Sequence, residues 1–156
     1  MRKLLEAVSL AILAALFLVV GFALYGPDRL PAQIPTHFDA AGNANGWGSP
    51  LALLSLPIIA LGVYLAMTVV ARFPAMFSYP VPVTDENRPR LEALTLDMIA
   101  WLKAETAGLC AAITWVWVCA IRHPGQGFSP LWVLIFVGAI LVTVGLYIRA
   151  MFRTEI

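Results

Sequence analysis

Charged residues are scarce in this 156-residue chain: Asp, Glu, Lys and Arg make up 12% of it, whereas hydrophobic residues make up 61%. Soluble domains contain about 25% charged residues, because polar side chains have to cover most of their surface. The composition therefore excludes an ordinary water-soluble domain and indicates a membrane protein. The formal net charge is only +1, and the basic residues form no cluster, so nothing favours nucleic-acid binding.

Common catalytic and metal-binding patterns are also missing. The sequence has no HExxH motif, no Gly-rich phosphate loop and no zinc-finger spacing. Its two cysteines, Cys110 and Cys119, lie in one apolar stretch, at positions that face different sides of a helix and cannot form a disulfide with each other. These absences leave open whether the protein is an enzyme.

Long apolar runs dominate what is present. A helix needs about 20 apolar residues to cross a hydrocarbon core of about 30 Å, and four segments reach that length: about 4–25, 51–71, 99–121 and 131–150. We therefore predict an all-α membrane protein, with residues 1–156 forming a single four-helix transmembrane domain in the lipid bilayer. Pro57 is expected to kink the second span. Small residues recur at Gly62/Ala66 and Gly138/Gly145, which suits helix packing within the bundle or in a homo-oligomer.

Basic residues indicate the orientation of the spans. One side collects Arg2, Lys3, Arg72, Arg88, Arg90, Arg149 and Arg153, with Lys103 close to it, and the other side has only Arg29 and Arg122. Because positive residues are retained in the cytoplasm, both termini are predicted to be cytoplasmic. The loops 26–50 and 122–130 then lie outside.

The cytoplasmic connection, residues 72–98, divides into two parts. Pro74, Pro80 and Pro82 predict an irregular strap, since proline removes backbone donors and keeps its neighbours extended. From a cap at Thr84 or Asp85, helical spacing of apolar residues predicts a helix that continues into the third span.

The outer loop contains the stretch LPAQIPTHFDAAGNANGWGSP, residues 30–50. Pro31 and Pro35 hold the chain extended, and Gly42, Gly46 and Gly48 allow positive φ in tight reversals. We therefore predict an ordered extracytoplasmic loop rather than a flexible linker.

Polar and aromatic side chains in this loop are candidates for binding. His37 and Asp39 are two residues apart and point the same way in an extended segment. With His123 from the other outer loop they could hold a divalent metal or act as an acid/base pair, as in a small membrane enzyme at the outer interface. The alternative is that they form hydrogen bonds within the loop. Trp47 is expected at the membrane interface.

Ionisable residues also fall inside the predicted spans. Lys103 and Glu105 lie near the cytoplasmic end of the third span, at a depth similar to that of Glu6 in the first. A Glu6–Lys103 pair would account for two of these charges. Glu105 would then lack a partner, and intramembrane ionisable residues are functional candidates. A proton-coupled transporter that uses Glu105 is therefore a further alternative.

The loop stretch resembles the signature of a bacterial membrane domain of unknown function, number 1648, which forms the front part of SdpI-type proteins. The segment ENRPRLEALTLDMIAWLKAE resembles a second patch of that family. The matching positions are Leu30, Pro31, Ile34, Pro35, His37, Phe38, Gly42, Gly46, Trp47, Gly48, Asn87, Arg88 and Lys103. Asp39 stands where the family often has Asn, and Asn45 stands where it often has Asp.

The resemblance implies a multi-pass protein of the bacterial inner membrane that acts in immunity against a secreted peptide toxin or as a signal receptor. Its partner would then be a secreted peptide or another membrane protein. Together with the polar and aromatic chemistry of the loop, this leads us to predict a recognition site formed by His37, Phe38, Asp39, Gly42, Asn45, Gly46, Trp47 and Gly48.

Overall fold

The computed structural model describes residues 1–28, 30–39, 41–123 and 131–154. Its long helices are α1 (Arg2–Tyr25), α2 (Ser55–Val70), α3 (Arg88–Arg122) and α4 (Leu131–Phe152). Two short 3-10 helices are η1 (Pro50–Leu54) and η2 (Pro74–Met76). Strands β1 (Ile34–Phe38) and β2 (Ala44–Gly48) pair antiparallel. The fold is mostly helical, as predicted, but the connection between the first two long helices contains a two-stranded sheet that the all-α prediction did not include.

Four helical segments within the described residues are long and apolar enough to cross a membrane: Arg2–Tyr25, Pro50–Val70, Arg88–Arg122 and Val133–Phe152. Each overlaps one of the four apolar runs of the sequence. The prediction of four such helices is confirmed, and the chain has the architecture of a multi-pass membrane protein.

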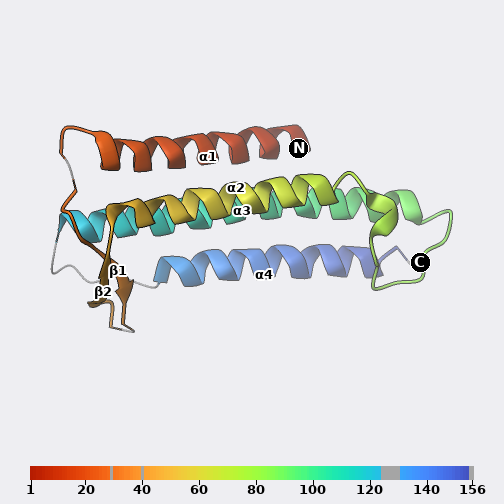
Figure 1. The fold of residues 1–156 in the computed structure, drawn as a ribbon. Helices are drawn as coiled ribbons and strands as arrows, with labels where there is room; N and C mark the ends of the chain where they lie inside the picture. The colour runs from red at the N-terminus through yellow and green to blue at the C-terminus, as the bar shows by residue number, and fades with distance from the viewer. Residues whose placement is uncertain (29, 40, 124–130, 155–156) are drawn as a thin grey trace.

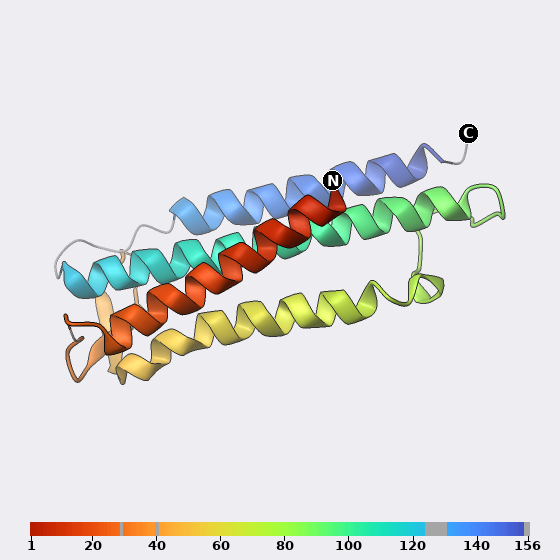
Figure 2. The ribbon, with the colours of Figure 1, turned by 90° about the horizontal axis from the view of Figure 1, so that it is seen from above.

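Helix α3 is the centre of the bundle and packs against α1, α2 and α4. Figure 1 shows the four helices side by side, and Figure 2 shows α1 crossing α3 obliquely. The β1–β2 hairpin lies at one end of the bundle, here called the hairpin end, and the segment 71–87 lies at the other, the strap end (Figure 1). With a rise of 1.5 Å per residue, α3 is about 52 Å long and exceeds a hydrocarbon core of about 30 Å.

Each helix buries only a narrow stripe. In α1 the buried residues recur every three or four positions, at Leu5, Ser9, Leu13, Leu16, Val20 and Ala23. This spacing follows the 3.6-residue period and leaves the other face open. In α4, none of the most apolar window is buried. Outward-facing apolar side chains of this kind suit contact with lipid.

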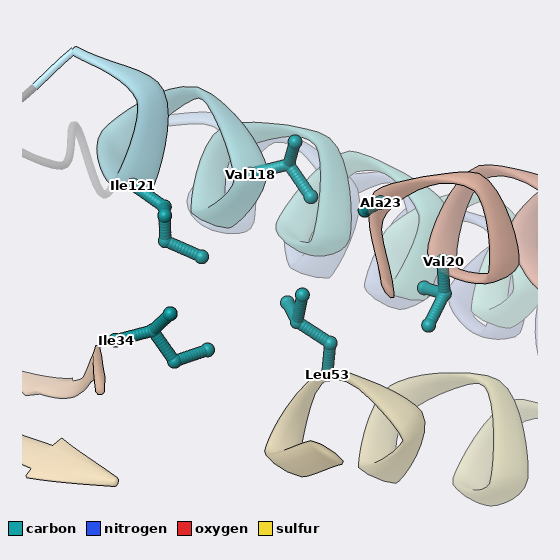
Figure 3. Close-up of a cluster of buried hydrophobic side chains, with 6 residues drawn as sticks. All are labelled: Val20, Ala23, Ile34, Leu53, Val118 and Ile121. Carbon is teal, nitrogen blue, oxygen red and sulfur yellow. The ribbon is translucent and has the colours of Figure 1, made fainter. Parts of the chain in front are cut away.

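Three buried clusters follow one another along the bundle. The cluster at the hairpin end joins α1, β1, η1 and α3 through Val20, Ala23, Ile34, Leu53, Val118 and Ile121 (Figure 3). A middle cluster includes Leu13, Ala60 and Ala107, and the cluster at the strap end contains Val81, Leu91 and Met151. The loops at both ends are therefore part of the packed structure.

Pro57 lies in the first turn of α2, directly after η1, where the segment changes from 3-10 to α-helical geometry. The expectation that small residues pack the helices of the bundle needs correction at three glycines. A Cβ added at Gly62, Gly138 or Gly145 would meet nothing within 4 Å in the described structure. The close helix contact is instead at Gly108, where such a Cβ would lie 3.0 Å from the ring of Phe136.

Candidate functional site

The segment between α1 and η1 contains a β-hairpin with an irregular ladder. Ile34 is opposite Gly48, Pro35 is opposite Trp47, and the register shifts on either side of His37. Because the strands are only five residues long and one includes a proline, a period-2 hydrophobic pattern is not visible in the sequence. The prolines did predict extended backbone here, and the structure shows strand β1 at Ile34–Phe38.

Asp39 organises the turn between the strands. Its carboxylate accepts hydrogen bonds from the backbone N–H groups of Ala41 at 2.9 Å and Asn43 at 2.8 Å. The Asn43 N–H bond is the largest cause that lowers the pKa of Asp39, since it stabilises the ionised form. Asp39 thus serves the loop's own backbone, which was the alternative that the sequence left open.

The three loop glycines have different roles. Gly42 has φ 84°, and no other described residue has a positive φ. Gly46 and Gly48 were expected to use positive φ as well, and this was wrong. They are needed for close approach, because an added Cβ would lie 2.9 Å from His37 Cβ at position 46 and 3.0 Å from Thr36 Cγ2 at position 48.

Two contacts attach the hairpin to the bundle. Ile34 is fully buried in the cluster at the hairpin end, where its side chain points toward Leu53 and the helices (Figure 3). Trp117 of α3 donates its indole N–H to the carbonyl oxygen of Pro35. The strands are therefore held against the bundle by an apolar contact and a directional one.

Polar and aromatic side chains remain exposed on the hairpin. His37 Nδ1 is hydrogen-bonded to Asn45 Oδ1, and in this pair the imidazole N–H donates. This leaves Nε2 of a neutral imidazole as an acceptor on the exposed side. Trp47 is 62% exposed, and Phe38 is half-buried. The hairpin thus presents an imidazole, an amide and an indole in defined positions.

The predicted metal site does not form. Among the described residues, no group of three or more His, Cys, Asp or Glu side chains is placed to hold a metal ion. His37 is engaged with Asn45, Asp39 caps the turn, and His123 follows the end of α3. Two residues of one short loop need not converge with a third from another loop, and sequence spacing alone could not decide this.

A groove of about 530 Å³ opens between α1 and α3 at the hairpin end. It is mainly apolar, with walls that include Phe22, Trp115 and Cys119. Arg122 and His123 also line it and are exposed. Ala23 and Val118 belong both to this groove and to the buried cluster that holds Ile34.

Inside the bundle, the expected Glu6–Lys103 pair is present, with 2.7 Å between Nζ and Oε1. Lys103 is 3% exposed, and its ammonium group lies 4.8 Å from the centre of the Tyr64 ring. The Tyr64 hydroxyl donates to the second oxygen of Glu6 at 2.7 Å. Glu6, Tyr64 and Lys103 therefore form one polar cluster that joins α1, α2 and α3. The sequence analysis missed Tyr64. Its presence in the second span was a signal, because a tyrosine hydroxyl inside a membrane protein usually donates a hydrogen bond to a nearby acceptor.

Glu105 has a partner that the sequence analysis also missed. Thr143 of α4 donates to Glu105 Oε1 at 2.6 Å. Oε2 is buried, without a hydrogen-bond partner among the described residues. Thr143 is the only Ser or Thr in α4 and could have been singled out for this reason.

The comparisons with known proteins concern the hairpin. Residues 12–61 match the model of a family described as a domain of unknown function, DUF1648. This segment begins within α1, contains the whole hairpin and ends within α2. No curated protein and no solved structure matches the chain. The resemblance of the loop to this family is therefore confirmed for residues 12–61, the segment that builds the candidate site.

Proposed function

We propose that the β1–β2 hairpin is a recognition surface on the outer face of the membrane, which binds a secreted peptide or another membrane protein. The observation that carries the proposal is the combination of a rigid attachment with exposed binding groups. Ile34 and the Trp117–Pro35 hydrogen bond hold the hairpin, whereas His37, Asn45 and Trp47 remain exposed. A surface ordered in advance loses little conformational entropy on binding.

The SdpI-type resemblance supports a peptide as the partner. Trp47 provides a large exposed indole, a side chain that often carries much of the energy of a protein interface. The mainly apolar groove beside Phe22 and Trp115 lies at the same end and offers room for an apolar side chain of such a peptide. A metal-dependent enzyme is not proposed, because His37, Asp39 and His123 do not form a ligand group.

The orientation can be tested first. Cys110 and Cys119 are replaced by alanine, and single cysteines are introduced at Ala41 in the hairpin turn or at Val83 in the strap, both exposed positions. A membrane-impermeant maleimide added to intact cells is expected to label position 41 and to label position 83 only after the membrane is opened. The reverse pattern would place the hairpin inside and contradict the proposal.

Recognition itself can be tested by photo-crosslinking in host cells. A benzophenone amino acid at position 41 is expected to form a discrete adduct, which mass spectrometry identifies, whereas the same group at position 83 forms none of that mass. The adduct should disappear in Trp47→Ala, provided that the variant retains its helical circular dichroism. An adduct that persists in Trp47→Ala, or no adduct at position 41, would contradict the proposal.

A further inference from the structure

The strap end contains a polar pocket that has no part in the proposed recognition at the hairpin. Its volume is about 440 Å³, and it is lined by residues of the strap together with Arg90, Arg153 and Thr154. Three separate segments meet here: the strap, the first turn of α3 and the residues after α4. No described residue of the hairpin end lines it.

Hydrogen bonds fix the strap side of the pocket. The Thr84 N–H donates to Asn87 Oδ1 at 2.8 Å, and the Asn87 N–H donates to Thr84 Oγ1 at 3.2 Å. This reciprocal arrangement is that of a capping box, with Asn in place of Glu or Gln. Asn87 Nδ2 also donates to the Pro82 carbonyl at 2.9 Å. Helix α3 itself begins at Arg88 with Asn87 as its N-cap residue, so the cap predicted at Thr84 or Asp85 was misplaced, and Thr84 instead closes the turn directly before the helix.

Apolar contacts fix the two arginines relative to each other. Leu91, next to Arg90, is fully buried, and Met151, two residues before Arg153, is 4% exposed. Both belong to the buried cluster with Val81. The backbones that carry the two guanidinium groups are therefore held by one core.

Among the described residues, the charged side chains that line the pocket are two arginines and one glutamate. Within the described chain, neither Arg90 nor Arg153 forms an ion pair, since the two salt bridges present are Arg2–Asp97 and Glu6–Lys103. Glu86 lines the same pocket without pairing with either arginine. Two cations that share one pocket repel each other. An anion bound between them would attract both and offset this repulsion.

We propose that this pocket binds a phosphate group through Arg90 and Arg153. Each guanidinium presents a planar fork of donors that matches phosphate oxygens, and a phosphate has enough oxygens to accept from two such forks at once. Thr84 Oγ1 accepts from the Asn87 N–H, so its own hydroxyl hydrogen is able to donate to the ligand. The volume of about 440 Å³ leaves room beyond a bare phosphate ion, which suits a phosphate carried by a larger molecule: the headgroup of an anionic phospholipid or a water-soluble phosphate ester.

The proposal is tested with the full chain in nanodiscs. In discs of phosphatidylcholine, glycerol 3-phosphate is added and the unfolding temperature is measured, with sodium chloride at equal ionic strength as the control for screening. In a second arm, native mass spectrometry compares the retention of phosphatidylglycerol with that of phosphatidylcholine. Stabilisation by glycerol 3-phosphate identifies a soluble ester, and selective retention of phosphatidylglycerol alone identifies a lipid headgroup.

The variants are Arg90→Gln and Arg153→Gln, with Arg88→Gln as the matched control. Arg88 lies in the same turn of α3, is exposed and does not line the pocket. Loss of either pocket arginine should weaken binding at least ~10-fold, as expected for a charge-assisted hydrogen bond. The control should bind like the unmodified protein. Absence of binding in both arms, or an equal loss in Arg88→Gln, would overturn the proposal.

Discussion

Trp117 in α3 and Pro35 in β1 are 82 positions apart in the sequence, and the indole N–H of the first donates to the carbonyl oxygen of the second. Pro35 also pairs with Trp47 in the hairpin ladder. The hydrogen bond therefore links the central helix of the bundle to the strand that carries His37.

Trp117→Phe should loosen the hairpin without unfolding the bundle. Phenylalanine keeps an aromatic ring in place but lacks the donor, so about 0.5–1.5 kcal/mol should be lost. Hydrogen exchange of the hairpin amides should accelerate, while exchange in the middle of α3 stays unchanged. Trp115→Phe is the matched control, because Trp115 is 63% exposed. Equal acceleration in both variants would show that the hydrogen bond does not hold the hairpin.

The Glu6–Lys103 pair should show strong coupling. Glu6→Gln leaves the ammonium group of Lys103, which is 3% exposed, without its counter-charge. Removal of one partner of a buried pair costs about 3–5 kcal/mol, and about 2–3 kcal/mol is expected here because the Glu6 side chain is 36% exposed.

The double variant Glu6→Gln/Lys103→Met should be more stable than Glu6→Gln alone, since no unpaired charge remains. Thermal or denaturant unfolding in detergent measures the double variant and both single variants, Glu6→Gln and Lys103→Met. Additive losses in the double variant would show that the two side chains do not interact energetically.

Glu105→Gln should maintain or raise the stability of the bundle. Glutamine keeps an oxygen that accepts from Thr143, and it cannot ionise at this buried position, where Oε2 has no described partner. Thr143→Val should instead destabilise by about 1–3 kcal/mol, because it leaves both carboxyl oxygens of Glu105 without a described hydrogen-bond partner. A lower unfolding temperature for Glu105→Gln would contradict this account. The transport alternative predicts that the same variant alters a proton-dependent flux across vesicles.

The hairpin turn should weaken at acidic pH. The pKa of Asp39 is lowered from 3.8 by the hydrogen bonds that its carboxylate accepts, first that from Asn43 N–H. A carboxyl whose pKa is lower in the folded state contributes stability that is present above its unfolded pKa and is lost as the pH falls through the folded value. The amide resonances of Ala41 and Asn43 should therefore titrate with a midpoint below 3.8.

Asp39→Asn is the control for this titration, because its amide oxygen can still accept from the turn but does not ionise. The acid transition of the turn should disappear in that variant. A midpoint at or above 3.8, or an unchanged transition in Asp39→Asn, would show that Asp39 does not control the turn.

Hydropathy and residue chemistry determined the larger features of this protein by themselves. A run of about 20 apolar residues partitions into lipid, where no water is present to bond the backbone N–H and C=O groups. The backbone must then form its hydrogen bonds internally, as in a helix, so the four runs predict four long helices. The Glu6–Lys103 pair was also predictable, because two opposite charges at a similar depth in neighbouring spans stabilise each other. Prolines and glycines made extended backbone and a tight turn predictable between the first two long helices, because the φ of proline is restricted and that of glycine is permissive.

Only the tertiary structure decided which distant residues meet. The burial of Ile34 among α1, η1 and α3, the partnership of Trp117 with Pro35, and that of Thr143 with Glu105 depend on how helices cross, which hydropathy does not encode. The same applies to His37, Asp39 and His123, which sequence spacing allowed to form one site and which are not grouped as metal ligands in the described structure. It also applies to Arg90 and Arg153, which share a pocket because the strap, α3 and α4 pack on one core.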